Sequence, residues 1–210
     1  MAGAAMGRAE TDRPGLAAHH VGSVAALGRG DSEDAYQHAT AISPAGALAS
    51  HVPLALWVLM DLVEAAARTG RHAEAAAHVT AIRDAGLAAN SPRLSLVAGG
   101  SEAITAPDGS ALGLFEKALA IPGADHFPFD LARVRLLYGE RLRRERATKE
   151  SRPHLAAALK IFERLGARPW AARAASELRA AGKLKPARTS QNATRSRHRN
   201  ARSRCWPRPA

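Results

Sequence analysis

The chain of 210 residues is poor in cysteine and in aromatic residues, and each shortage excludes a class of protein. Its single cysteine, Cys205, allows no disulfide framework within the chain, which is typical of proteins of the reducing cytosol. Aromatic residues make up only 4% of the chain, so the core must be built from aliphatic and small side chains. Small side chains let helices approach closely, whereas sheets favour Val, Ile, Tyr and Phe. The composition therefore predicts an all-α fold.

Long apolar segments are missing as well. The first 16 residues contain acidic and basic side chains where a secretory signal peptide has an apolar centre. The longest apolar stretch, residues 52–60, includes Pro53 and is far shorter than the about 20 residues that a membrane-spanning helix needs. We therefore expect a cytoplasmic protein without a membrane partner.

Positive charge is concentrated at one end of the chain. The formal net charge is +11, and residues 183–210 carry nine basic side chains and no acidic one, which leaves +2 for residues 1–182. The basic residues are Lys183, Lys185, Arg188, Arg195, Arg197, Arg199, Arg202, Arg204 and Arg208. Such a segment attracts phosphate groups, whereas residues 1–182 give no comparable reason to bind nucleic acid.

Three interpretations of residues 183–210 stand side by side, and all of them predict disorder. One is a nucleic-acid-binding tail, although Trp206 is its only aromatic side chain for stacking on bases. A second is an ordinary disordered linker, because the segment is polar and highly charged. The third is a shifted reading frame, since GC-rich DNA read out of frame yields stretches rich in Arg, Pro, Ser, Cys and Trp. In each case we expect at most weak, non-specific attraction to DNA.

Between residues 16 and 181, Ala-rich stretches with apolar residues at helical spacing alternate with short breakers. Ser91 and Pro92 supply an N-cap hydroxyl and a first-turn proline, and Gly70 and Gly86 suit left-handed C-cap positions. The pattern predicts eight or nine antiparallel helices and no strand. The breakers are residues 28–31, 43–44, 69–71, 84–86, 90–92, 106–109, 122–123 and 166–169.

A two-helix unit recurs along the chain at intervals of about 35–40 residues. One position falls midway along the first helix of each unit. Three further positions, 12, 16 and 19 residues later, share one face of the second helix, because they are four and then three residues apart. The first-helix positions are Ser23, Val63, Gly99, Gly139 and Ala174. The second-helix positions are Ala35, Ala39, Ile42, Ala75, Val79, Ile82, Ala111, Phe115, Ala118, Ser151, Leu155 and Ala158.

This unit is similar to the tetratricopeptide repeat, whose period is about 34 residues. The match is degenerate, because Val63 is not small and two units run several residues long. The alternative is an Ala-rich helical bundle, in which a lattice of small residues fits the same template by chance. We predict a tetratricopeptide-like helical-hairpin solenoid over residues 16–182, with a disordered N-terminus at residues 1–15 and a disordered basic tail at residues 183–210.

Several stretches resemble the large, ATP-binding LuxR-type transcription regulators of actinobacteria, over about residues 20–182. The most specific stretch is residues 162–170 (FERLGARPW), followed by residues 177–179 (ELR). The other stretches are residues 41–44, 50–57, 61–65, 69–75, 127–133 and 138–144.

In that family a helical repeat region lies between an upstream ATPase and a C-terminal helix-turn-helix. The resemblance therefore implies a fragment of a transcription regulator, whose concave helical surface binds a protein or small effector and relays that binding to a DNA-binding module. The chain departs from the family in lacking a G-x-x-x-x-G-K-[ST] phosphate loop. It departs again after Gly182, where no helix-turn-helix pattern follows, and this abrupt change makes us favour a shifted frame for residues 183–210.

The alternative function is a stand-alone tetratricopeptide-like protein-interaction module without a role in transcription. We expect no enzyme, and we assign no catalytic, cofactor-binding or metal-binding residue. Residues 99–103 (GGSEA) are faintly similar to a nucleophile elbow, but they lack its last glycine and follow a helical pattern, which favours a packing site between helices. Residues 125–126 (DH) have no nucleophile placed near them. The spacing of His72 and His78 does not suit a metal, so we expect surface histidines there and at residues 19–20.

Two further features have structural interpretations. Trp57 and Trp170 follow prolines at the starts of helices, and we expect both to be packing anchors between repeats. Residues 140–146 form a charge run in which Arg141 and Glu145 are four residues apart. This spacing predicts a solvated helix face with ion pairs.

Overall fold

The computed structural model describes residues 13–48 and 53–182, and these residues contain nine α-helices, three short 3-10 helices and no strand. The α-helices are α2 (Arg13–Arg29), α3 (Ser32–Ile42), α4 (Leu59–Arg68), α5 (His72–Asp84), α6 (Pro92–Thr105), α7 (Ala111–Leu119), α8 (Pro128–Arg144), α9 (Thr148–Arg164) and α10 (Arg168–Ala180). The 3-10 helices are η1 (Pro53–Leu56), η2 (Leu87–Asn90) and η3 (Ala124–His126). The predicted all-α fold is confirmed for these residues.

The described part of the chain differs slightly from the predicted boundaries. Helix α2 begins at Arg13, three residues ahead of the boundary placed at residue 16. Its second residue is Pro14. A proline is tolerated in the first turn of a helix because the N–H groups of that turn have no intrahelical hydrogen-bond acceptor. The rest of the predicted disordered N-terminus and the whole basic tail lie outside the described residues.

Four turns between helices share one hydrogen-bond pattern. Gly30, Gly70, Arg146 and Gly166 have positive φ angles of 65–85°. In each turn, the N–H of the following residue donates to the carbonyl five residues before it, at 2.8–2.9 Å. This hydrogen bond caps the C-terminus of the helix before the turn, and the chain then reverses direction. The C-caps predicted at Gly70 and at Gly86, whose φ is 62°, are therefore confirmed.

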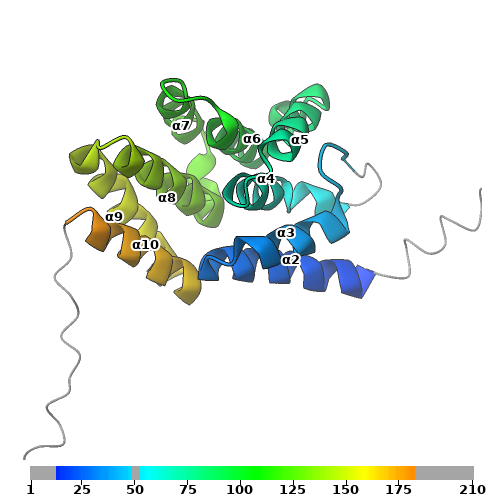
Figure 1. Ribbon diagram of the computed structural model, residues 1–210, viewed down its shortest axis with the longest axis horizontal. Helices are drawn as coiled ribbons and strands as arrows, with labels where there is room; N and C mark the ends of the chain where they lie inside the picture. Colours follow the sequence, from blue (N-terminus) through cyan, green and yellow to red (C-terminus); the bar gives the residue numbers. More distant parts are fainter. Residues whose placement is uncertain (1–12, 49–52, 183–210) are drawn as a thin grey trace, which may run out of the picture.

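The helices form consecutive hairpins that follow one another around a ring (Figure 1). Helices α2, α4, α6 and α8 pair with α3, α5, α7 and α9, and α10 follows α9. Each first helix contacts the first helix of the next hairpin, from α2 to α4, α6, α8 and α10. Helix α10 then contacts α2, so the inner helices close on themselves.

The closing contact between α10 and α2 joins segments about 146 residues apart. The indole N–H of Trp170 donates to the carbonyl of Val24 at 3.1 Å, and a guanidinium N–H of Arg173 donates to the carbonyl of Leu27 at the same distance. Trp170 also lies so close to Gly28 that a Cβ there would come within 2.8 Å of its Nε1. Figure 1 shows the end of α2 meeting the start of α10.

Most of the positions chosen from the sequence repeat lie at helix contacts. All of them are buried except Gly99, which is partly exposed. A Cβ at Gly139 would lie 2.6 Å from the side chain of Leu155, and a Cβ at Gly99 would lie 3.0 Å from that of Ala118. At Gly99 and Gly139 the first helix therefore lies close to the second helix of the same unit.

The two tryptophans have different environments. Trp170 is buried between α2, α8 and α9, with ring centroids 5.6 Å from those of Phe129 and Phe162, so its predicted anchoring role is confirmed. Trp57 is 53% exposed, and the prediction that it anchors two repeats is wrong. It lies in the turn between η1 and α4, where the adjacent Val58 fills the core and turns the indole outward.

Candidate functional site

The inner faces of α4, α8 and α10 meet at a cluster of charged side chains, here named the ionic hub. Its members are Asp61, Glu64 and Arg68 of α4, Arg133 and Glu140 of α8, and Arg173 of α10. Three guanidinium groups thus face three carboxylates, and the hub is neutral as a whole. An open helical repeat would present these inner faces to a ligand, but here they are joined to one another.

Glu64 lies at the centre of the hub. Its carboxylate accepts hydrogen bonds from Arg173 at 2.7 Å, from Arg68 at 3.0 Å and from Arg133 at 3.1 Å. Burial alone would raise the pKa of Glu64, but the three arginines outweigh burial and hold that pKa well below its ordinary value. Glu64 is therefore ionised throughout the physiological pH range.

Arg173 connects more helices than any other member of the hub. Its guanidinium donates to Glu64 of α4, to Glu140 of α8 at 2.8 Å and to the Leu27 carbonyl of α2. Burial opposes its charge, but the two carboxylates raise its pKa above the ordinary value. Because charges taken out of water are costly unless paired, removal of one member would leave its buried partners with too little counter-charge and destabilise the fold.

His20 of α2 lies at the edge of the hub without adding to its charge. Its Nδ1 is 3.9 Å from Oδ2 of Asp61, and its ring packs against Trp57 with centroids 5.7 Å apart. Burial lowers the pKa of His20, although Asp61 partly opposes this effect. The imidazole is therefore neutral at physiological pH, and the balance of the hub is undisturbed.

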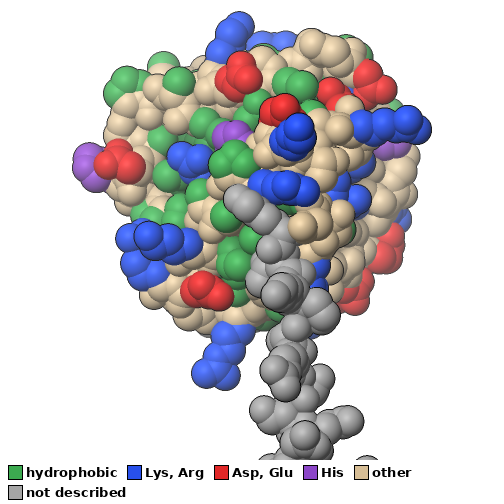
Figure 2. All heavy atoms as spheres, turned by 90° about the vertical axis from the view of Figure 1, so that its left-hand side faces the viewer, with side chains coloured by type: hydrophobic (Ala, Val, Ile, Leu, Met, Phe, Trp, Pro, Cys, Tyr) green, Lys and Arg blue, Asp and Glu red, His purple; other side chains and the backbone are tan. Residues whose placement is uncertain are grey.

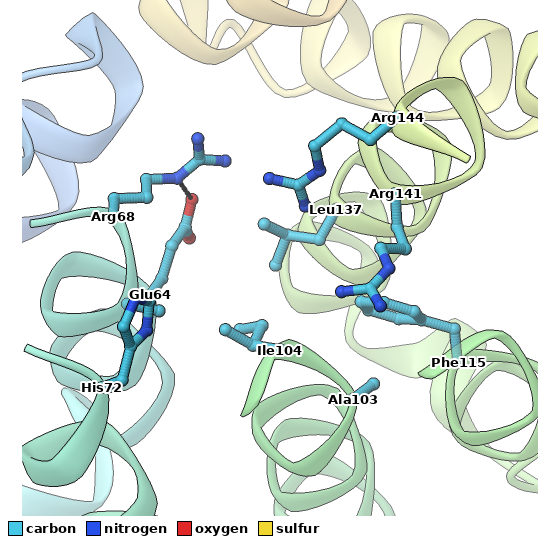
Figure 3. Close-up of a pocket in the computed structure, with 10 residues that line it drawn as sticks. Glu64, Arg68, His72, Ala103, Ile104, Phe115, Leu137, Arg141 and Arg144 are labelled. Carbon is cyan, nitrogen blue, oxygen red and sulfur yellow. Dashed lines mark hydrogen bonds and ion pairs between the residues drawn. The ribbon is translucent and has the colours of Figure 1, made fainter. Parts of the chain in front are cut away.

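A cleft of about 190 Å³ opens beside the hub, where α4, α6 and α8 end. Figure 3 shows its apolar wall, formed by Ile104, Phe115 and Leu137, and the guanidinium groups of Arg68 and Arg144 pointing into it from opposite sides. The remaining lining residues are Glu64, Ala67, His72, Ala103 and Arg141. Glu64 and Arg68 belong to both features, so the hub forms the inner wall of the cleft.

The three arginines of the cleft differ in their partners. Arg68 is bound by Glu64 and Glu140 of the hub. Arg141 pairs with Asp108 and, at 2.5 Å, with Glu145. Arg144 has no carboxylate within 4.0 Å among residues 13–48 and 53–182. Partial loss of hydration lowers the pKa of Arg144, which stays charged at physiological pH.

The charge run at residues 140–146 matches its prediction only in part. Arg141 and Glu145 form the expected ion pair. Glu140 does not lie on a solvated face: it is buried in the hub, because it follows Arg133 by two helical turns and shares its inward direction. Basic and acidic side chains, with apolar ones between them, are scattered over the face that Figure 2 shows.

The faint nucleophile-elbow pattern at residues 99–103 lies inside α6 and serves packing. The Ser101 hydroxyl is buried and donates to the carbonyl of Val97 at 2.8 Å. A Cβ at Gly100 would lie 3.0 Å from Val134 of α8 and 3.2 Å from Met60 of α4. The preferred interpretation, a small-residue contact between helices, is confirmed.

The histidines have mixed positions. His72 lines the cleft, but His78 is fully buried, so the prediction of a surface histidine is wrong there. His78 lies between Ala75 and Ile82 on the inward face of α5, and its Nδ1 accepts a hydrogen bond from the Gly46 N–H at 3.3 Å. Burial lowers its pKa to about 4. Residues 125–126 form part of η3.

The ionic hub was not predicted from the sequence. The signal was present in the run 59–66, where Asp61 and Glu64 interrupt apolar residues on what becomes a fully buried stretch of α4. Arg68 follows Glu64 by one helical turn, but the partners from α8 and α10 lie about 70 and 109 residues away, and no local spacing connects those pairs.

Within the described ranges, no three His, Cys, Asp or Glu side chains are grouped as metal ligands would be. None of the helices in these ranges is both long and apolar enough to cross a membrane. Comparisons of the chain with protein-family models, with curated proteins and with solved structures give no match.

Proposed function

We propose that residues 13–182 form a tetratricopeptide-like scaffold in the helical repeat region of a LuxR-type transcription regulator. In this role the scaffold is not an enzyme, acts in the cytoplasm, and relays the binding of an effector or partner to DNA binding by a separate module. The observation that carries the proposal is the two-helix unit, whose positions chosen by spacing alone lie almost entirely at buried helix contacts.

The hairpin arrangement supports the tetratricopeptide-like assignment. Successive first helices contact one another along the inner side, and each packs against its own second helix. Small residues at the crossing points, such as Gly139 against Leu155, allow the close approach that such repeats need. Stacked two-helix repeats that bury a shared core are the architecture of binding scaffolds.

The stretch that most resembles LuxR-type regulators is also structurally informative. Within residues 162–170, Phe162 is buried in the core, Gly166 adopts the left-handed turn before α10, and Trp170 makes the contact that closes the ring. The residues of the resemblance therefore coincide with the residues that position the last helix. This coincidence supports the family proposal without depending on residues 183–210.

A role without catalysis fits the chemistry of the hub. A general acid or base needs a proton that it can exchange near neutral pH. The central carboxylate, Glu64, is held ionised by three arginines, and its neighbours are arginines that stay protonated. The hub therefore supplies cohesion between helices rather than proton transfer, and the cleft beside it is the proposed place for an effector.

The test is a DNA-binding comparison of two chains. One is the 210-residue chain, and the other continues after Gly182 in the reading frame that restores the best helix-turn-helix pattern. Both are titrated with the promoter region beside their own gene and with random duplex, over a range of salt concentrations. We expect sequence-specific binding by the frame-restored chain only, with any binding by the 210-residue chain weakening steeply as salt rises.

Two outcomes would count against the proposal. Sequence-specific binding by the 210-residue chain at physiological salt would place the DNA-binding function within it. If no reading frame after Gly182 yields a helix-turn-helix and neither chain prefers the promoter, the alternative of a stand-alone protein-interaction module would be favoured.

A further inference from the structure

We propose that the cleft between α4, α6, α7 and α8 binds a small apolar monocarboxylic acid. The carboxylate would pair with the guanidinium of Arg144, and the apolar body would lie against Ile104, Leu137 and Phe115. This inference names the chemical class of the effector in the proposed function and rests on that function, but binding of the acid is measurable without DNA.

The charge balance beside the cleft points to a single anionic group. Arg68 belongs to the neutral hub, and Arg141 is matched by Asp108 and Glu145. Arg144 is the one lining arginine of the described chain for which no ion pair forms. Figure 3 shows its guanidinium directed into the opening, toward the hub. One carboxylate would neutralise the site, whereas a polyanion would exceed its free charge.

The walls and the size of the cleft limit the rest of the ligand. Phe115 and Leu137 are almost completely buried and Ile104 partly so, and these apolar side chains line the cleft beside the arginines. The volume of about 190 Å³ is below the range of about 300–1,000 Å³ that is typical of drug-sized ligands. A single ring or a short branched chain fits these limits, whereas a nucleotide does not.

The negative potential at the carbonyl ends of the helices does not by itself explain the direction of the Arg144 guanidinium. The carbonyl ends of α4, α6 and α8 favour cations nearby, and this explains why basic residues gather in the last turn of α8. It does not explain why the guanidinium of Arg144, an exposed residue, is directed into the opening. A bound carboxylate supplies the missing counter-charge and a charge-assisted hydrogen bond.

The experiment measures binding of sodium benzoate to the 210-residue protein by calorimetry and by amide NMR shifts. Benzamide is the neutral control of the same shape, and inorganic phosphate is the anion without an apolar body. We expect benzoate to bind with a Kd on the order of 1 mM, which suits so small a ligand. Benzamide and phosphate should each bind at least about tenfold more weakly.

Two variants locate the site. Arg144→Gln should weaken benzoate binding by at least about tenfold, because it removes the charged partner. Arg83→Gln is the matched control, since Arg83 also lies in the last turn of a helix but away from the cleft, and it should leave binding unchanged. Ile104→Ser should weaken benzoate while leaving phosphate unaffected, which separates the apolar contact from the charge. Circular dichroism should show that all three variants are folded.

Several results would overturn the inference. These are the absence of benzoate binding at 10-fold the expected Kd, equal binding of benzamide, phosphate binding as tight as benzoate, or unchanged binding in Arg144→Gln. Tighter binding of an acetylated dipeptide ending in phenylalanine than of benzoate would reassign the cleft from a free acid to a protein C-terminus. None of these results depends on DNA, so the proposed regulatory role is tested separately.

Discussion

Gly139 offers the sharpest test of the packing between repeats, through its replacement by alanine. A Cβ at this position would lie 2.6 Å from both Cγ and Cδ2 of Leu155 and 3.3 Å from the Ser151 carbonyl oxygen. Leu155 is fully buried, so it has no free space into which it can turn. Overpacking of this kind costs about 1–3 kcal/mol, against a gain of about 1 kcal/mol because alanine favours the helix.

Gly113 is the matched control, because it also lies within a helix and a Cβ there would meet nothing within 4 Å. Since the helix-propensity gain is common to both substitutions, their difference measures the clash alone. We expect Gly113→Ala to be as stable as the wild type or more so. Gly139→Ala should melt about 4–8 °C below Gly113→Ala, which corresponds to a difference of about 2 kcal/mol in the free energy of unfolding. Equal melting temperatures in thermal circular dichroism would refute the proposed contact between α8 and α9.

Three further predictions concern stability. The folded state keeps His78 neutral down to about pH 4 so that it accepts the Gly46 N–H, whereas the unfolded chain takes up a proton below about pH 6.5. The contribution of His78 to the free energy of unfolding is therefore fully present above pH 6.5 and should fall by about 3 kcal/mol as the pH drops to 4. Urea titrations should show this loss in the wild type and not in His78→Gln. Trp170→Ala should cost about 3–5 kcal/mol because the ring is buried, whereas Trp57→Ala should cost about 1 kcal/mol or less, as measured by urea unfolding. Ala75→Leu should cost about 1–3 kcal/mol by the same measurement, and a neutral effect would contradict the repeat register.

Local patterns were sufficient to predict the helices and several of their caps. The Ser91 N-cap accepts a hydrogen bond from the Leu94 N–H, and the C-caps at Gly70 and Gly86 have positive φ, because caps depend only on neighbouring residues. The repeat positions were predictable for a similar reason: a fixed spacing determines which residues share a helix face.

The closure of the ring was not predictable from these patterns. It depends on pairs such as Arg173 with Glu64, which are 109 residues apart and follow no local spacing. The charge run of α8 shows the same limit, because Glu140 and Arg141 are adjacent but face the hub and the cleft rim respectively. His78 was expected at the surface and is buried, since one residue of helical phase decides which side of α5 becomes buried, whereas Trp57 lies in a turn and is exposed.

The ion pairs of the ionic hub join the inner helix faces and leave the cleft beside them open, and this arrangement is the basis for placing the proposed ligand in the cleft. A double-mutant cycle on Glu64 and Arg173 tests the hub most directly. Free energies of unfolding are measured by urea titration for the wild type, Glu64→Gln, Arg173→Met and the double variant. We expect a coupling energy of at least about 1.5 kcal/mol between these two buried groups. The exposed pair Glu33 and Arg71, treated in the same way, should show a smaller one. A coupling energy near zero for Glu64 and Arg173 would contradict the closed ring and return the inner helix faces to solvent and to ligands.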